Sequence, residues 1–148
     1  MKIKKVNKKD LNEIHKLELT IFNEDAFSLD LIKELINNNT FFFKLERGKI
    51  KKELIGIIIA IKDKADRINV INFFVNPTYQ RKGYGSLLLK HVIYNVKQLN
   101  EIKKIVLNVN VNNTQAIKLY KSFNFKKVQK IDNYYRSKES SFLLELKI

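Results

Sequence analysis

The sequence predicts an α+β protein whose sheet is mostly antiparallel and contains one parallel pair of strands. Two Phe- and Ile-rich segments flank Arg47-Gly48-Lys49, a combination typical of an antiparallel hairpin. Farther along, a helical pattern separates two strand patterns, which is the arrangement of a parallel strand–helix–strand unit. The length of 148 residues and the hydrophobic content of 45% fit one domain with its own core. We therefore expect a single domain over residues 1–148.

The N-terminal part of the chain predicts one strand and two helices. Residues 1–6 alternate weakly between polar and apolar side chains, which indicates a strand. Asn7 is a residue type that caps helices, and apolar residues at helical spacing follow it. Ser28 is a second candidate cap, for a helix that extends to about Ile36. The apolar positions of the first helix are Leu11, Ile14, Leu17, Ile21 and Phe22.

The rest of the chain predicts further strands and two more helices. The expected strands are Thr40–Glu46, Glu53–Lys62, Arg67–Val75, Lys104–Val109, Phe125–Ile131 and Ser141–Leu146. The expected helices run from Gly83 to about Leu99 and from Thr114 to Phe123. The resulting order is βααβββαβαββ, which gives about seven strands and about four helices.

The residues that break regular structure are concentrated near the middle of the chain. The only proline, Pro77, and two of the four glycines, Gly83 and Gly85, fall within nine residues. The segment Gln80–Gly85 joins a predicted strand to a predicted helix, whose first N–H groups lack partners and lie at the positive end of the dipole. Glycine lets an anion approach the backbone, and the Arg-Lys pair before Gly83 adds positive charge. The segment is therefore a candidate phosphate or pyrophosphate site.

Two common nucleotide-binding motifs do not match this segment. A P-loop needs Gly-x-x-x-x-Gly-Lys-Ser/Thr, and the spacing here differs. A dinucleotide fingerprint needs a third glycine, where this chain has Leu88. Because glycine also occurs at helix starts for purely local reasons, Gly-x-Gly alone does not identify a ligand.

The stretch from Val75 to Gly85 and a second one from Asn113 to Phe125 together resemble the acetyl-CoA motifs of the GNAT acetyltransferase superfamily. The stretch from Val75 to Gly85 reads Val-x-Pro-x-x-Gln-x-x-Gly-x-Gly, and the family pattern is Gln/Arg-x-x-Gly-x-Gly/Ala. The stretch from Asn113 to Phe125 reads Asn-x-x-Ala-x-x-Leu-Tyr-x-x-x-Asn-Phe, where the family has Gly in place of Asn124. Asparagine tolerates the left-handed backbone conformation, so we expect the same turn at this position.

The resemblance extends to the RimI-type branch of the family, which acetylates protein N-termini. Asn133-Tyr134-Tyr135 is similar to an Asn-Tyr-Tyr of that branch, and Ile21–Ser28 is similar to its Phe-x-x-x-x-Trp-Ser segment, with Phe27 in place of Trp. The resemblance implies a GNAT fold with a splayed parallel pair and acetyl-CoA as cosubstrate. It also implies direct transfer to a primary amine in a ternary complex. The implied partner is the N-terminal α-amine of a protein or peptide, ribosomal and ribosome-associated proteins included.

The same resemblance assigns the cofactor to the end of one strand, to the glycine loop and to the later helix, where Asn113 would contact it from the start. The last residues of the strand before the glycine loop would hydrogen-bond the pantetheine arm through their backbones, and the loop itself would hold the pyrophosphate. The residues expected to bind acetyl-CoA are Phe73, Phe74, Val75, Arg81, Lys82, Gly83, Tyr84, Gly85, Ser86, Asn113 and Tyr120.

Tyr120 is also the general acid that the resemblance implies, since a phenol with a pKa of about 10 can give a proton to the departing thiolate. The alternative is that Tyr120 is a half-buried aromatic on an amphipathic helix. Phe22, Tyr134 and Tyr135 would border the acceptor by analogy, and packing is the alternative for both tyrosines. These are the predicted acceptor residues.

Asn108 is the main departure from the family pattern. RimI-type enzymes place a glutamate twelve residues before the catalytic tyrosine as general base, and some relatives a histidine; this chain has Asn108 there. An amide cannot accept a proton at neutral pH and can only position a water. The pKa of an α-amine is about 7.7–8.0, against about 10.4 for lysine, so an α-amine needs less help in losing its proton. We therefore predict a catalytic role for Asn108 that favours an α-amine over a lysine side chain.

The net charge of +14 and the shared cofactor chemistry leave other functions open. Such a charge favours anionic partners, but the lysines are spread over the whole chain, as compositional bias also produces. One alternative is acetylation of a small-molecule amine or a lysine side chain, because the same cofactor half serves many acceptors. Another is a basic RNA- or ribosome-binding module with a residual CoA site. Nucleic acid is not the expected substrate.

Several classes of protein are excluded by composition. The absence of cysteine excludes a disulfide scaffold, a thiolate zinc site and a cysteine nucleophile. His15 and His91 are the only histidines and are expected to pack on apolar faces, so no metal site is predicted. The longest apolar run, Leu54–Ile61, is far shorter than the roughly 20 residues that span a bilayer. With no apolar segment behind the N-terminal charges, we expect a cytoplasmic protein without a membrane partner.

Overall fold

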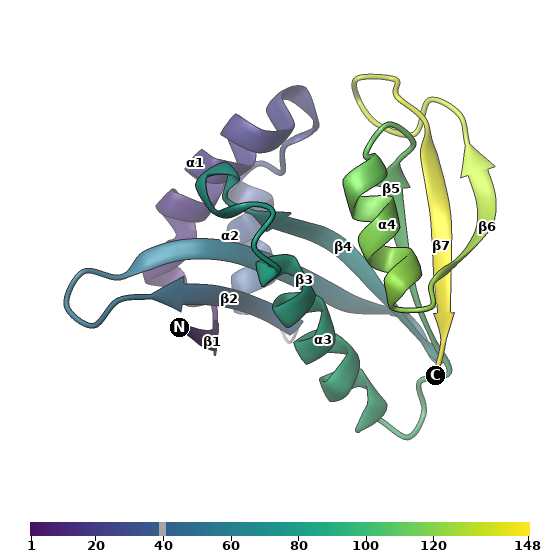
Figure 1. The fold of residues 1–148 in the computed structure, drawn as a ribbon, viewed down its shortest axis with the longest axis horizontal. Coiled ribbons are helices and arrows are strands. Elements are labelled where there is room, and N and C mark those ends of the chain that lie inside the picture. Colours follow the sequence, from purple (N-terminus) through teal and green to yellow (C-terminus); the bar gives the residue numbers. More distant parts are fainter. Residues whose placement is uncertain (39–40) are drawn as a thin grey trace. The chain divides into compact units, whose positions relative to one another are not determined.

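The structure is a computed structural model that describes residues 1–38 and 41–148. Its strands are β1 (Lys2–Lys5), β2 (Phe41–Arg47), β3 (Glu53–Lys64), β4 (Arg67–Val75), β5 (Lys104–Asn110), β6 (Lys126–Ile131) and β7 (Ser141–Lys147). Its α-helices are α1 (Leu11–Phe22), α2 (Leu29–Asn37), α3 (Tyr84–Lys97) and α4 (Thr114–Ser122), labelled in Figure 1. Thr40, where the second strand is predicted to begin, lies outside the described residues.

The described strands form a seven-stranded sheet in the order β1-β2-β3-β4-β5-β7-β6. β4 and β5 run parallel, from Arg67 opposite Lys104 to Val70 opposite Leu107. The pairs β1–β2, β2–β3, β5–β7 and β6–β7 are antiparallel. The predicted α+β class, with a mostly antiparallel sheet and one parallel pair, is confirmed.

Capping side chains set the helix boundaries. Asn7 Oδ1 accepts from Lys9 N and Asp10 Oδ2 accepts from Asn7 N, both at 2.9 Å, and this capping box opens a short 3-10 turn before α1. Ser28 Oγ accepts from Leu31 N at 3.1 Å, so Ser28 caps α2 as predicted. α3 begins at Tyr84, one residue later than predicted, because the preceding glycine has a φ of 81°, outside the helical region.

The described chain divides into two compact units, and β3, β4 and α3 contribute residues to both. The first unit comprises Met1–Ala60 and Asn72–Asn95, and the second comprises Ile61–Ile71 and Val96–Ile148. The fully buried large side chains of the first unit are Ile14, Ile32, Leu45, Ile55, Ile57, Ile58, Ile59, Leu88 and Leu89. Those of the second unit are Ile68, Ile105 and Leu107. The expected single domain over residues 1–148 stays a prediction.

Gly56 lets α3 and β4 approach β3 closely in the first unit. A Cβ at Gly56 would lie 2.6 Å from the carbonyl oxygen of Phe74 and 3.2 Å from Cδ1 of Leu88. Since the first of these contacts is with backbone, a side chain here would push β4 away from β3. The glycine therefore fixes the spacing of the strand and the helix that flank the predicted glycine loop.

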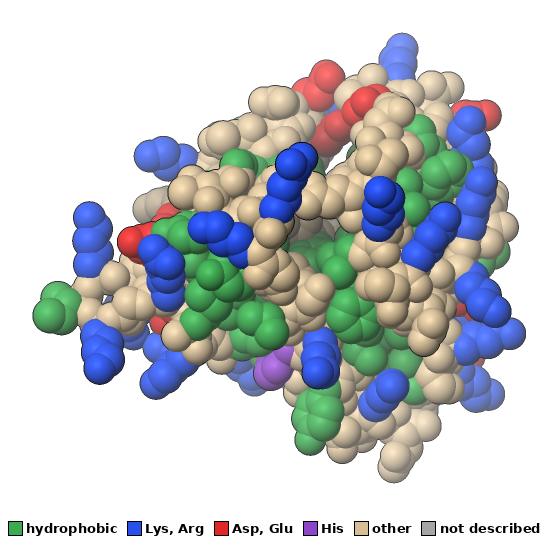
Figure 2. All heavy atoms as spheres, viewed as in Figure 1, with side chains coloured by type: hydrophobic (Ala, Val, Ile, Leu, Met, Phe, Trp, Pro, Cys, Tyr) green, Lys and Arg blue, Asp and Glu red, His purple; other side chains and the backbone are tan. Residues whose placement is uncertain are grey.

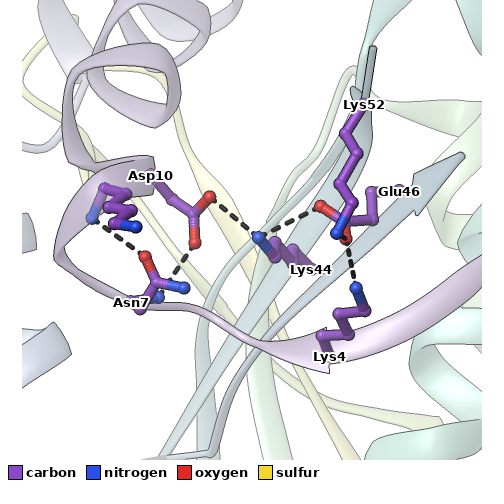
Figure 3. Close-up of polar contacts among 7 residues, drawn as sticks. Lys4, Asn7, Asp10, Lys44, Glu46 and Lys52 are labelled. Atoms are coloured by element: carbon purple, nitrogen blue, oxygen red, sulfur yellow. Dashed lines mark hydrogen bonds and ion pairs between the residues drawn. The ribbon is translucent and has the colours of Figure 1, made fainter. Parts of the chain in front are cut away.

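A charged cluster whose central residues, Lys44 and Glu46, are buried joins β1 and β2 to the turn before α1 (Figure 3). Lys44 Nζ lies 2.8 Å from Asp10 Oδ1 and 3.1 Å from Glu46 Oε2, and Glu46 Oε1 lies 2.9 Å from Lys4 Nζ. Burial alone would raise the pKa of Glu46, but the hydrogen bonds from Lys4 and Lys44 outweigh it and lower the pKa to about 2. Charge pairing therefore stabilises this edge of the first unit.

The outer strand β6 carries a basic, exposed surface. Lys126, Lys127 and Lys130 are all exposed, and β6 ends the strand order of the sheet. Figure 2 shows Lys and Arg side chains over much of the visible face, in keeping with their spread along the sequence.

Every helix among the described residues is too short or too polar to cross a membrane.

Candidate functional site

The predicted glycine loop lies between β4 and α3 in the first unit and follows a hydrogen-bonded turn. Asn76 donates its N–H to the carbonyl of Ile55 at 2.7 Å, and its side chain accepts from Thr78 N at 3.1 Å. Gln80 donates from Nε2 to the carbonyl of Val75 at 3.0 Å. These bonds fix the path of the chain from the end of β4 to the start of the loop.

Tyr79 anchors this turn to the β2–β3 hairpin. The side chain is buried, and its hydroxyl donates a hydrogen bond to the carboxylate of Glu53. The guanidinium of Arg47 lies 4.9 Å from the centre of the ring, and Lys82 Nζ lies 5.9 Å from it, both within the range of cation–π attraction. Tyr84, the first residue of α3, packs edge-on against the same ring at 6.4 Å. One buried ring therefore contacts the hairpin, the loop and the helix.

The loop itself presents positive charge and open space. Arg81 and Gly83 have φ values of 65° and 81°, a left-handed conformation that helps to turn successive N–H groups toward an anion. A Cβ at Gly83 would meet no atom within 4 Å, and Arg81, Lys82 and Gly83 are all exposed. Because the N-terminus of a helix is the positive end of its dipole, an anionic group at the start of α3 is favoured.

Phe73, Phe74 and Val75 are the last three residues of β4. Phe74 is buried and packs edge-on against Phe22 of α1, with 6.2 Å between ring centres, while Phe73 and Val75 are half-buried. The registered pairs with β5 end at Val70, so these three residues lie beyond them. Their contacts with a cofactor stay predictions, as does the role of Phe22.

Asn108 lies on β5 in the second unit and is half-buried. Its Oδ1 accepts a hydrogen bond from Ser141 Oγ at 3.0 Å, and Ser141, on the adjacent strand β7, is fully buried. The buried hydroxyl thereby fixes the orientation of the amide. Its predicted catalytic role stays a prediction.

Tyr120 is buried on α4 and packs edge-on against Phe125 at 5.8 Å. Burial raises the pKa of the Tyr120 phenol well above its usual range, and the nearby Tyr135 raises that pKa further. The phenol therefore stays protonated at neutral pH, as a proton donor must. Asn124, just after α4, has a φ of 72°, which confirms the left-handed turn expected there.

Glu139 connects the two loops of the second unit that carry predicted site residues. Tyr134 and Tyr135, in the β6–β7 connection, pack edge-on with ring centres 4.9 Å apart. Glu139, in the same connection, accepts from Asn110 Nδ2 at 2.8 Å and from Asn112 Nδ2 at 3.4 Å. Both amides belong to the segment that leads into α4, so the carboxylate joins the loop of Tyr134 and Tyr135 to that segment.

Asn113 caps α4, since its Oδ1 accepts from Ala116 N at 3.1 Å. Its predicted contact with the cofactor stays a prediction. His91 is half-buried and packs edge-on against Phe43 at 4.6 Å, as expected of a packing residue. Among the described residues, no three His, Asp or Glu side chains group as metal ligands would.

Glu18 and Asn72 are buried polar residues of the first unit that the sequence does not single out. Glu18 accepts from Asn72 Nδ2 at 2.8 Å and from Phe27 N at 3.0 Å. A signal does exist: Glu18 lies four residues after Ile14 and four before Phe22, which places a carboxylate on the apolar stripe of α1. Asn72, which binds Glu18 from 54 residues away, has no such signal.

Comparison with known families agrees with this arrangement. Residues 8–125 match the acetyltransferase (GNAT) family, and the chain belongs to that family. The match includes both stretches on which the resemblance rests, from Val75 to Gly85 and from Asn113 to Phe125.

Individual relatives are similar to parts of the chain. The N-alpha-acetyltransferase of Saccharolobus solfataricus is 36% identical over 76 residues, which cover 51% of this chain and 46% of that protein. The spermine/spermidine N(1)-acetyltransferase of Bacillus subtilis is 38% identical over 63 residues, 43% of this chain and 41% of that one. The ribosomal protein bS18-alanine N-acetyltransferase of Escherichia coli is 33% identical over 86 residues, which cover 56% of this chain and 57% of that protein. The matches thus span about half the length of these relatives.

The fold is similar over almost the whole chain. A crystal structure of the ribosomal-protein-S18-alanine N-acetyltransferase from Escherichia coli matches with a TM-score of 0.86 at 24% identity, covering 99% of this chain and 93% of that one. The likeness is one of fold, and it agrees with the strand order described above.

Proposed function

We propose that this protein transfers an acetyl group from acetyl-CoA to a primary amine, and that the acceptor is the N-terminal α-amine of a protein or peptide in the cytoplasm. Ribosomal and ribosome-associated proteins are included among the acceptors. The observation that carries the proposal is the open, cationic loop at the start of α3 in a chain of the GNAT family.

The residues of the loop fit the pyrophosphate of acetyl-CoA. Gly83 leaves space in front of the backbone, and Arg81 and Lys82 supply charge beside it. Gly85 and Ser86 continue the loop into the first turn of α3. The backbones of Phe73, Phe74 and Val75 would hold the pantetheine arm, and Asn113 would add a contact from the start of α4. The cosubstrate supplies a reactive acetyl thioester.

Tyr120 and Asn108 would serve the two proton transfers that amide formation needs. Tyr120 would protonate the departing sulfur, and its raised pKa keeps the required proton in place at neutral pH. Asn108, held by Ser141, would orient a water that receives the amine proton. This arrangement suits an α-amine, because its pKa of about 7.7–8.0 leaves a fair fraction neutral at the start. Phe22, Tyr134 and Tyr135 would border the acceptor chain.

The test is incubation of the purified protein with acetyl-CoA and short peptides that vary in their first two residues, read by mass spectrometry. We expect an added acetyl group at the α-amine, with a preference among the first two residues. Matched peptides with a blocked N-terminus and an internal lysine are the control. Faster acetylation of these lysine peptides than of free N-termini would contradict the proposed acceptor.

A polyamine or other small amine is the second candidate acceptor. Supporting it is the similarity to the spermine/spermidine N(1)-acetyltransferase of Bacillus subtilis over 43% of this chain. Spermidine and spermine belong in the same assay. A larger kcat/KM for either polyamine than for every peptide would replace the N-terminal acceptor with this one.

A further inference from the structure

Glu18 is a buried carboxylate whose hydrogen-bond donors are both neutral. The residue is only 1% exposed and lies on α1, four residues before the helix ends. Both of its oxygens lie 2.8 Å from Asn72 Nδ2, and Oε1 also accepts from Phe27 N at 3.0 Å. Burial raises the pKa of Glu18, and these two donors offset the effect only in part. A buried carboxyl group is costly to ionise, so its place in the interior calls for a specific role.

The contact with Asn72 and a second, aromatic contact hold α1 in register with β4. Phe22 lies one helical turn after Glu18 and packs on Phe74, which lies two strand residues after Asn72. Four residues of helix rise about 6 Å, and two residues of strand rise about 6.6 Å. Because these steps match, the polar pair and the aromatic pair form together and fix the position of the last turn of α1 along the strand.

The contact with Phe27 adds the connection between α1 and α2. Asn23 has a φ of 52°, and the chain makes a short 3-10 turn over Asn23–Asp25 before Ser28 caps α2. Phe27 N donates to Glu18 across nine residues and closes this connection onto α1. One carboxylate therefore joins the end of a helix, the loop that follows it and a sheet strand, all within the first unit.

We propose that Glu18 is a positioning residue for the acceptor amine. It holds Phe22 and the connection up to Ser28 at a fixed place relative to β4, whose last residues are those assigned to the cofactor. The inference rests on the proposed function. Glu18 acts through Asn72 and Phe27 and need not touch the acceptor, and a carboxylate suits the role because it can accept all three of these bonds.

Acceptor kinetics of Glu18→Ala test the role directly. We expect the KM for the peptide to rise about tenfold, because displacement of a positioning group by a fraction of an ångström is costly, while the KM for acetyl-CoA stays within about twofold. Hydrogen exchange at the Phe27 amide should become faster in the same variant, since its acceptor is gone. Glu13→Ala, an exposed glutamate on the same helix, is the matched control and should change none of these quantities.

An exchange of the two partners separates positioning from loss of stability. Asn72→Asp sets two carboxylates within hydrogen-bond distance and should raise the peptide KM at least as much as Glu18→Ala. Adding Glu18→Gln should restore the KM, because the introduced amide can donate to the aspartate and still accept from Phe27 N. A lower melting temperature in Glu18→Ala with an unchanged peptide KM would overturn the inference, and so would an equal rise in both KM values. If the wild-type protein transfers acetyl to no acceptor at all, the proposed function fails and this inference with it.

Discussion

Ser141 donates a hydrogen bond to Oδ1 of Asn108 at 3.0 Å, so the amide that the family resemblance aligns with a general base already accepts a hydrogen bond at its oxygen. An amide is not basic at neutral pH, and the hydroxyl contact does not make it so. If the proposed reaction holds, the amine must lose its proton to water or be bound already neutral. The activity of the wild-type protein should therefore rise with pH through the pKa of the α-amine, about 7.7–8.0.

Replacement of Asn108 by glutamate should supply the missing base. With Ser141 still able to donate to the new carboxylate, we expect Asn108→Glu to increase kcat/KM for a peptide about tenfold near pH 6. The gain should vanish above about pH 8.5, where the amine is neutral without help. Asn100→Glu, which adds the same charge at an exposed position of the same unit, is the control. A lower rate at every pH would show that this side chain does not face the reacting amine.

Loss of the Tyr120 hydroxyl should separate catalysis from binding. We expect Tyr120→Phe to lower kcat by about 100-fold or more, because a proton donor is lost while the buried ring remains. Calorimetric binding of CoA should stay within about threefold of the wild type, which is under 1 kcal/mol. The control is Tyr94→Phe, at an exposed tyrosine of α3, which should leave kcat and CoA binding unchanged. Equal losses of binding and rate in Tyr120→Phe would assign this residue to structure alone.

Tyr79, which anchors the turn before the glycine loop, should control the affinity for acetyl-CoA. Tyr79→Phe removes the hydroxyl that binds Glu53 but keeps the ring beneath Arg47 and Lys82. We expect the KM for acetyl-CoA to rise about threefold to tenfold, in line with about 1 kcal/mol for one hydrogen bond, with kcat nearly unchanged. Steady-state kinetics at saturating peptide measure this. An unaltered KM would mean that the turn keeps its place without the phenol.

The charged cluster of Figure 3 should contribute to stability at neutral pH and lose that contribution in acid. Glu46→Gln leaves the buried Lys44 with Asp10 as its remaining anion, and we expect a loss of about 3 kcal/mol in the free energy of unfolding at pH 7. The pKa of Glu46 in the folded protein, about 2, is below its ordinary value, so its stabilisation is present above about pH 4.3 and disappears as the pH falls toward 2. Urea unfolding of both proteins at pH 7 and pH 2.5 should show the difference shrink. A constant difference would exclude charge pairing as its cause.

The contribution of Glu18 to stability should depend on pH in the opposite direction to that of Glu46. Its pKa is raised in the folded protein, so its contribution to stability is largest below about pH 4.3 and is lost as the pH rises through the folded-state value. Glu18→Gln cannot ionise. The melting temperature of this variant relative to the wild type should therefore increase between pH 4 and pH 7. A fall over that range would mean that the ionised carboxylate is the better-bound form.

The sequence predicts those parts of the fold that depend on local patterns. The hairpin around Gly48, the caps at Asn7 and Ser28 and the left-handed turn at Asn124 all come from residue types with strong backbone preferences. The start of α3 differs by one residue because Gly83 could equally begin a helix or precede one, and only its positive φ decides. Local signals therefore give the elements, with small errors at their ends.

Contacts between distant residues could not be predicted in this way. Tyr79 is a loop residue by pattern, yet it is buried because Glu53, 26 residues earlier, lies beside it in the folded chain. Glu139 is one of many charged loop residues until the fold brings Asn110 close to it. Hydrophobic periodicity reports which face of an element is buried, and it carries no information about which polar residue lies opposite.

The lysines of β6 have a consequence for self-association. An outer strand offers unpaired backbone groups on which another strand can add, and this is a common route to aggregation. A second copy pairing there would bring the exposed Lys126, Lys127 and Lys130 of one strand next to the same residues of the other. The repulsion between these ammonium groups opposes extension of the sheet, so this edge is protected against polymerisation by its own side chains.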